Sequence, residues 1–90
     1  MTWGAIATWR MAHDGLLKAT EELQQGGAAG TAVEQLIKEV EDYPFYKSVG
    51  YGGLPNEEGI LEMDAAYMDG DTFAIGAVAG ITDVKNPILV

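Results

Sequence analysis

Residues 60–80 read ILEMDAAYMDGDTFAIGAVAG and contain two apolar runs, Ile60 to Met68 and Thr72 to Gly80, joined by Asp69-Gly70-Asp71. An Asp-Gly pair between apolar runs is typical of a β-hairpin. We therefore expect residues 60–68 and 72–80 to pair as antiparallel strands. Neither face of the second run is polar, so the sheet should be covered on both sides.

Two helices are predicted upstream of this hairpin, at residues 12–25 and 31–42. The first segment is rich in straight-chain helix formers and ends at Gly26-Gly27, a typical left-handed stop. In the second, Thr31 and Glu34 form a capping-box pattern, and apolar residues recur at helical spacing at Val33, Leu36, Ile37 and Val40. The opposite face should be solvated, and it carries Glu34, Lys38, Glu41 and Asp42. We expect this helical hairpin to cover one face of the sheet.

The two ends of the chain add further elements. Residues 3–9, Trp-Gly-Ala-Ile-Ala-Thr-Trp, are short, apolar and uncharged, which favours a strand buried on both faces. Asn86 followed by Pro87 is typical of a helix start, a cap residue and then a first-turn proline. Because this helix would begin inside an apolar run at the C-terminus, we expect residues 1–90 to be a single partial domain of a larger α+β protein.

The composition excludes several classes of function. The 90 residues carry 14 Asp plus Glu against 5 Lys plus Arg, a formal net charge of -9, and such a field repels nucleic acid and acidic membranes. With 48% apolar residues the chain can nevertheless build a core. It has no cysteine and a single histidine, His13, which excludes disulfides, thiolate zinc sites and multi-histidine metal sites. We expect a reduced, cytoplasmic protein with no metal and no cofactor.

A long loop, Tyr43 to Gly59, separates the helices from the hairpin. Ordered loops of this length in compact domains are usually functional. Its Gly50-Tyr51-Gly52-Gly53 segment is followed by Leu54 and Pro55, where nucleotide-binding loops have a third glycine or a Gly-Lys-Ser/Thr ending. We interpret the segment as a tight turn that needs positive φ or close backbone packing.

Three further side chains are candidates for a site. Glu62 and Asp64 share one strand face, so a paired acid/base site is conceivable. The favoured interpretation is a structural pair, or partners for backbone amides in the glycine loop. Trp9 ends the predicted first strand, where open sheets place ligands, although the residues alone favour core packing.

Several motifs in one order carry a resemblance to a known family. They are Thr8-Trp9, Gly26-Gly27 followed by Ala32-Val33-Glu34, Val40-Glu41-Asp42-Tyr43-Pro44, Ser48-Val49-Gly50-Tyr51-Gly52-Gly53-Leu54-Pro55-Asn56, Leu61-Glu62-Met63-Asp64-Ala65, Met68-Asp69-Gly70, Gly76-Ala77-Val78 and Lys85-Asn86-Pro87-Ile88. With these motifs, residues 5–90 resemble the glycosylasparaginase branch of the asparaginase type 2, isoaspartyl peptidase group.

The resemblance implies an N-terminal nucleophile amidohydrolase with an αββα four-layer sandwich. Such an enzyme is made as a precursor that cuts itself and frees a threonine, whose α-amine acts as base for its own hydroxyl. That threonine would lie beyond residue 90, so we expect no catalytic residue in this chain and no activity of the chain alone. The resemblance places Trp9 and Ser48 at the substrate pocket, and Gly50, Gly52 and Gly53 in the loop beside it.

The expected partners follow from the same resemblance. They are a small-molecule or glycosylated asparagine substrate, the missing second (β) subunit and further copies in a homo-oligomer. The alternative is a stand-alone acidic interaction domain that self-associates through the apolar face of its sheet, because exposed apolar area of this size otherwise leads to aggregation.

Overall fold

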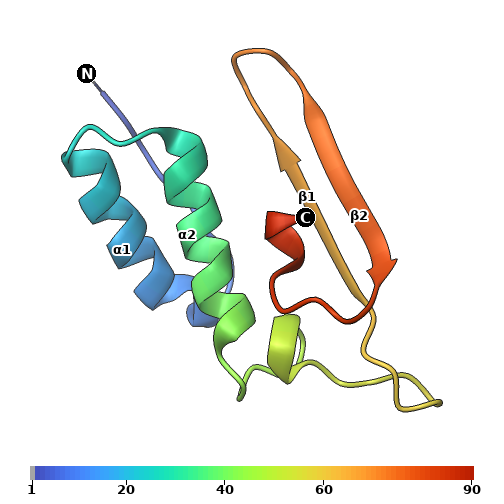
Figure 1. The fold of residues 1–90 in the computed structure, drawn as a ribbon. Coiled ribbons are helices and arrows are strands. Elements are labelled where there is room, and N and C mark those ends of the chain that lie inside the picture. The colour runs from blue at the N-terminus through green and yellow to red at the C-terminus, as the bar shows by residue number, and fades with distance from the viewer. Residues whose placement is uncertain (1) are drawn as a thin grey trace. The chain divides into compact units, whose positions relative to one another are not determined.

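The computed structural model describes residues 2–90, which form two compact units, one up to Val40 and one from Glu41 to Val90 (Figure 1). The helices are α1 (His13–Gln24) and α2 (Ala29–Asp42), and the strands are β1 (Met63–Met68) and β2 (Ile75–Ile81). Three short 3-10 turns complete the order of elements: η1 (Arg10–Ala12), η2 (Gly50–Gly52) and η3 (Pro87–Leu89). The α+β class is confirmed, whereas the single partial domain stays a prediction. No helix in the described residues is long and apolar enough to cross a membrane.

The predicted helical hairpin is confirmed in the N-terminal unit, where α1 and α2 lie side by side (Figure 1). α1 ends in a Schellman motif. The amide of Gly27 donates to the carbonyl of Glu22 at 2.9 Å, and the amide of Gly26 donates to the carbonyl of Leu23 at 3.1 Å. Gly26 has a φ of 84°, a left-handed conformation that glycine adopts without steric cost. The two glycines therefore end α1, as the sequence predicts.

Helix α2 begins at Ala29 and not at residue 31. The amide of Ala32 already donates to the carbonyl of Ala28 at 3.1 Å. Thr31 therefore lies within the first turn and is not the N-cap, so the predicted capping box is wrong. The physical reason is that alanine is the best helix former, and the alanines before Thr31 extend the helix past the expected cap.

Small side chains let the two helices approach closely. Gly15 of α1 faces Leu36 of α2, and a Cβ atom on Gly15 would stand 2.9 Å from the carbonyl oxygen of Leu36. On the surface, Lys18 Nζ donates to Glu39 Oε1 at 2.8 Å, and this hydrogen bond raises the pKa of Lys18. Because that pair is solvated, it adds little stability. The buried residues of this region are mostly small, among them Ala12, Gly15, Ala19 and Ala32.

Residues 3–9 do not form a strand, so this prediction is wrong. Neither helix nor strand occurs between residues 2 and 8, and Ile6 is 95% exposed. A strand needs a neighbour for its backbone N–H and C=O groups. In the described residues the two strands pair only with each other. An apolar run without a partner strand therefore stays irregular.

The predicted β-hairpin is confirmed in the C-terminal unit, with shorter strands than expected. β1 and β2 pair antiparallel, with Met68 opposite Ile75. The amide of Asp69 donates to the carbonyl of Ala74 at 2.9 Å, which closes a loop over residues 70–73. The second strand therefore starts later than predicted, because the turn takes up more residues than the Asp-Gly pair alone.

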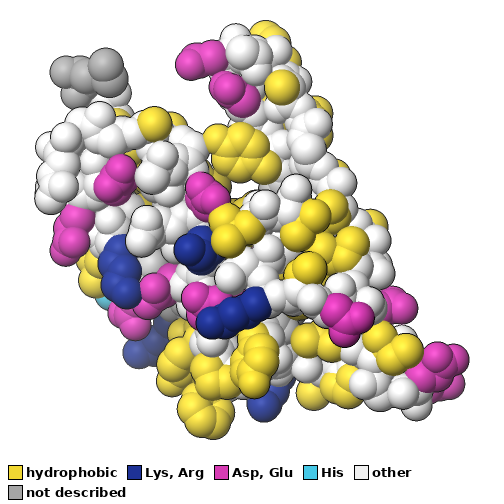
Figure 2. Space-filling view, in the orientation of Figure 1, with side chains coloured by type: hydrophobic (Ala, Val, Ile, Leu, Met, Phe, Trp, Pro, Cys, Tyr) yellow, Lys and Arg dark blue, Asp and Glu magenta, His cyan; other side chains and the backbone are white. Residues whose placement is uncertain are grey.

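Side chains of the hairpin are largely exposed, although the sequence predicted a sheet covered on both faces. Met63 is buried, whereas Phe73 and Ile75 are 73% and 70% exposed. Figure 2 shows hydrophobic side chains over this hairpin. The predicted cover of both faces is therefore not found in the residues that the structure describes, and the packing of the helices on the sheet stays a prediction.

A β-bulge interrupts the hairpin opposite Asp64. The register shifts between Met63 and Ala65, so that β2 has one extra residue there. Gly80 takes a φ of 62°, as glycine does in the bulge type that places it in the left-handed region. Its amide donates to Asp64 Oδ1 at 2.8 Å. The carboxylate of Asp64 thus accepts an amide at the point where the register of the ladder shifts.

Replacing Asp64 with alanine should lower the free energy of unfolding by about 0.5–1.5 kcal/mol, the usual net worth of one hydrogen bond. Urea unfolding measures this loss, and the exchange rate of the Gly80 amide should rise with it. Asp64→Asn keeps an oxygen acceptor and should lose less. Asp71→Ala removes an exposed carboxylate of the same hairpin and serves as control, so equal losses at both positions contradict the assignment.

Candidate functional site

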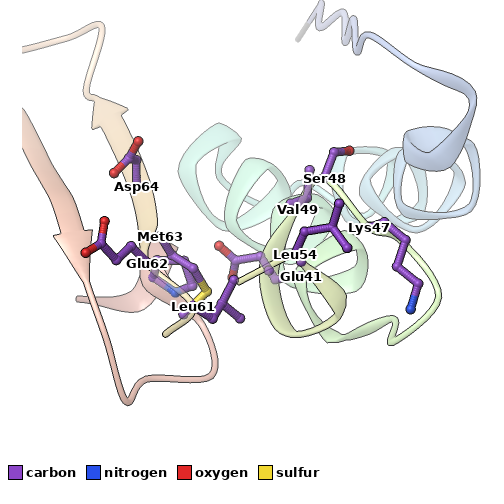
Figure 3. Close-up of a pocket in the computed structure, with 12 residues that line it drawn as sticks. Glu41, Lys47, Ser48, Val49, Leu54, Leu61, Glu62, Met63 and Asp64 are labelled. Carbon is purple, nitrogen blue, oxygen red and sulfur yellow. The ribbon is translucent and has the colours of Figure 1, made fainter. Parts of the chain in front are cut away.

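A cleft of about 430 Å³ lies within the C-terminal unit (Figure 3). The long loop supplies Lys47 and Ser48 on one side, and the start of the hairpin supplies Glu62 and Asp64 on the other. The complete lining is Glu41, Lys47, Ser48, Val49, Gly50, Gly53, Leu54, Leu61, Glu62, Met63, Asp64 and Pro87. A cleft of this size falls within the range of about 300–1,000 Å³ that is typical of small-molecule sites.

The N-terminal unit also has a groove, of about 890 Å³, but that groove has no ionisable lining residue. Its walls are mostly small or apolar residues, such as Trp3, Ile6, Ala19 and Ala32. Acid–base or nucleophilic chemistry needs titratable or hydroxyl groups. Of these two, the cleft of the C-terminal unit has the titratable groups, together with Ser48, which the sequence singles out, and we take it as the candidate site.

The glycine turn forms the loop wall of the cleft. Gly50 has a φ of 63°, and the amide of Gly53 donates to the carbonyl of Gly50 at 2.9 Å. A Cβ atom on Gly50 would overlap the backbone of Glu41, and one on Gly52 would overlap the carbonyl of Pro44. The interpretation as a tight turn with positive φ and close backbone packing is therefore confirmed. Ser48 lies exposed just before this turn.

The opposite wall carries the two acidic residues that the sequence singled out. Glu62 and Asp64 both line the cleft and both are exposed. Asp64 accepts the Gly80 amide, which supports the structural interpretation over an acid/base pair. The amide belongs to β2, however, and not to the glycine loop as expected. Met63, which lies between Glu62 and Asp64 in the sequence, is buried.

Glu41 is the lining residue that sequence reasoning misplaced. The sequence predicts that it lies on the solvated face of the second helix, but it is only 2% exposed. Its Oε1 accepts from Asn86 Nδ2 at 3.1 Å, and its Oε2 accepts from the amide of Ile88 at 3.2 Å. No local pattern signals this burial, because the donors lie more than forty positions away.

Trp9 lies in the N-terminal unit and does not line this cleft. It is 78% exposed and has a φ of 69°, so the interpretation as a core residue is wrong. Its carbonyl accepts the amide of Ala12 at 3.1 Å, which starts the turn before α1. A left-handed φ is strained for a bulky residue. Its role at a substrate pocket stays a prediction.

The charges of the cleft are mostly negative. The lining residues include three carboxylates, Glu41, Glu62 and Asp64, and one cation, Lys47. Carboxylates at the mouth of a cleft raise the local concentration of cationic groups. The described residues contain no group of three or more His, Cys, Asp or Glu that could hold a metal ion. The arrangement therefore suits a small ligand with an ammonium group.

Comparison with known proteins gives one consistent family. The family model described as Asparaginase matches residues 6–90. The N(4)-(Beta-N-acetylglucosaminyl)-L-asparaginase of Elizabethkingia miricola is 41% identical over 85 residues, which are 94% of this chain and 25% of that protein. The Isoaspartyl peptidase/L-asparaginase of Xenopus laevis is 44% identical over 73 residues (81% and 23%), and the Plant-type L-asparaginase of Pyrococcus abyssi is 47% identical over 78 residues (87% and 25%). The chain spans about a quarter of the length of these curated relatives.

The close fit of Gly50 against Glu41 predicts a difference between two glycine substitutions. Gly59 also has positive φ, at 79°, but has open space where a Cβ atom would lie. Gly59→Ala should therefore cost only the left-handed strain, about 1–2 kcal/mol. Gly50→Ala adds the overlap with the Glu41 backbone and should cost about 3 kcal/mol or more. Chemical unfolding of both variants measures the difference, and equal costs contradict the close packing.

Proposed function

Because the chain belongs to the asparaginase family, we propose that the protein of which it is a part is an amidohydrolase that cleaves the side-chain amide of asparagine-type substrates. The names of the three relatives share this substrate chemistry: a glycosylated asparagine, an isoaspartyl peptide and asparagine itself. The observation that carries the proposal is the cleft that the glycine turn after Ser48 forms with the acidic start of the hairpin.

The cleft suits an asparagine-type ligand in size and charge. Its volume of about 430 Å³ accommodates an amino acid with a modest substituent. Glu62 and Asp64 favour an α-ammonium group at its mouth by charge. The hydroxyl of Ser48 can donate to a carbonyl or carboxylate and accept from an amide. These groups bind and orient a substrate but supply no nucleophile with an adjacent base.

The nucleophile in this proposal is a threonine outside the 90 residues. Self-cleavage of the precursor frees its α-amine, which takes the proton of the threonine hydroxyl as that oxygen attacks the side-chain amide. The chain described here then contributes substrate-binding residues, Trp9 and Ser48, with Gly50, Gly52 and Gly53 shaping the loop beside the pocket. The second subunit, a homo-oligomer and a cytoplasmic location belong to the same proposal.

The specific substrate is the finer part of the proposal. We propose N(4)-(β-N-acetylglucosaminyl)-L-asparagine, or else L-asparagine and isoaspartyl peptides. The relative with the widest match to this chain among the three is named for the glycosylated substrate. Trp9 supports this choice, since an exposed indole offers a flat apolar face of the kind that sugars stack on. Relative rates on the three substrates decide between them.

A second candidate function rests on the exposed hairpin. Phe73, Ile75 and Met68 are at least half exposed, and an apolar surface of this kind can serve self-association. In that case the chain is a stand-alone acidic interaction domain. Sedimentation of the 90-residue chain tests it, because a clean monomer contradicts the alternative. A reading frame that continues into a segment with a self-cleavage threonine favours the enzyme.

The proposed activity is tested with the complete protein and an aspartyl-anilide substrate. Ser48→Ala should raise KM about tenfold, the loss expected for one hydrogen bond to a charged group, and should change kcat much less. Thr82→Ala removes an exposed hydroxyl outside the cleft and should leave both constants unchanged. N-terminal sequencing of the mature subunits should find threonine at the new terminus. Absence of turnover in the correctly processed protein contradicts the proposal.

The 90-residue chain by itself should not hydrolyse the same substrate, because its described cleft offers no activated nucleophile. Purified chain and a heat-treated sample should release the anilide at the same background rate. Turnover above that background would place the catalytic group within these residues and contradict the assignment of the nucleophile to the missing part.

A further inference from the structure

We infer that Glu41 is a positioning residue that holds together the two walls of the candidate cleft. The inference rests on the proposed function only for the identity of the ligand. Glu41 lies at the end of α2. Its carboxylate contacts Asn86 on the side of the hairpin wall, and its main chain contacts Gly50 on the side of the loop wall.

The carboxylate fixes the segment that follows the hairpin. Oε1 accepts from Asn86 Nδ2 at 3.1 Å, and Oε2 accepts from the amide of Ile88 at 3.2 Å. Both partners are donors, so both oxygens of Glu41 must be acceptors. A glutamine at this position would present an NH₂ group to one of the two donors. The site therefore needs the ionised carboxylate and not only a side chain of the same size.

The segment held in this way belongs to one wall of the cleft. Pro87, between the two donors, is buried and lines the cleft. The turn that it opens, η3, packs against β1, whose first residues line the cleft as well. Fixing Asn86 and Ile88 therefore fixes the position of the wall that carries Glu62 and Asp64.

The main chain of Glu41 holds the other wall. Gly50 lies so close to the Glu41 backbone that even a methyl group would overlap it. Gly50 belongs to the turn that follows Ser48. Displacement of Glu41 is therefore expected to move both walls at once, and with them the distance between Ser48 and the acidic side.

Neighbouring charges strengthen this arrangement. Asp42 Oδ1 accepts from the same Asn86 amide group at 2.7 Å, and Lys85 Nζ lies 3.8 Å from that carboxylate. Asn86 is thus held by two carboxylates, and Lys85 offsets part of their repulsion. Asp42 shares only the contact with Asn86. In the hydrogen bonds of the described residues, the amide of Ile88 is bonded to the end of α2 through Glu41.

The test compares Glu41→Gln with Glu39→Gln in the complete protein. Both variants remove one negative charge from α2, but Glu39 pairs with Lys18 on the surface. Glu41→Gln should raise KM for the aspartyl-anilide about tenfold and change kcat less than about threefold, while Glu39→Gln changes neither. Partial unfolding lowers the active fraction and kcat without raising KM. A fall in kcat alone, or unchanged constants, overturns the inference.

Amide hydrogen exchange separates this inference from the proposed function. In Glu41→Gln the amides of residues 86–89 and of the glycine turn at residues 50–53 should exchange faster, and in Glu39→Gln they should not. If the wild-type protein hydrolyses no aspartyl amide, the proposed function fails while the exchange result still decides the role of Glu41. Unchanged exchange in either segment overturns the inference.

Asn86→Ala provides a second variant if Glu41→Gln does not fold. It keeps the carboxylate and the Ile88 contact and removes one of the two donors. KM should then rise by a smaller factor, about threefold, in the same direction. Asn86→Ala with unchanged KM and unchanged exchange at residues 86–89 counts against the inference.

Discussion

A buried carboxylate at the end of α2 is the constraint on which the C-terminal unit depends. A charged group that is 2% exposed must have hydrogen-bond donors, because an unpaired charge away from water costs several kcal/mol. Glu41 has donors in Asn86 and in the amide of Ile88. Its backbone accommodates Gly50 at the same point. The end of a helix, a glycine turn and the segment after a β-hairpin are thereby joined at one residue.

Close approach of backbones recurs in both units. In the N-terminal unit Gly15 admits Leu36 of the neighbouring helix. In the C-terminal unit Gly50 admits the backbone of Glu41 at the end of α2, and Gly52 admits the carbonyl of Pro44. The buried apolar residues are correspondingly few and mostly small. A chain of this length hides a smaller share of its surface than a large domain does. The close backbone approaches that glycine and alanine permit therefore contribute more to the packing within each unit than a large apolar core does.

In the proposed enzyme, the cleft gives this chain a part in amide hydrolysis although it supplies no nucleophile. The polar groups proposed to bind and orient the substrate are Ser48 and the carboxylates of Glu62 and Asp64, which line the cleft. The carboxylate of Asp64 also supports the bulge at Gly80, so the same side chain shapes the wall and contributes to its charge. Substrate recognition and bond cleavage are thus assigned to different parts of a longer polypeptide in the proposed enzyme.

Local signals determined much of the fold. Gly26-Gly27 predicted the end of α1, and Asp69-Gly70 between apolar runs predicted the hairpin, because glycine and turn residues act on the backbone within a few positions. Motifs spread over the chain indicated the family. Tertiary structure alone decided that residues 3–9 form no strand and that Glu41 is buried. Both depend on segments that are distant in the sequence. A strand requires a neighbouring strand, and in the part of the chain that the structure describes no strand pairs with residues 3–9. The donors for Glu41 come from Asn86 and Ile88. Such distant pairings leave no periodic or compositional trace, so they become visible only when the folded chain brings the segments together.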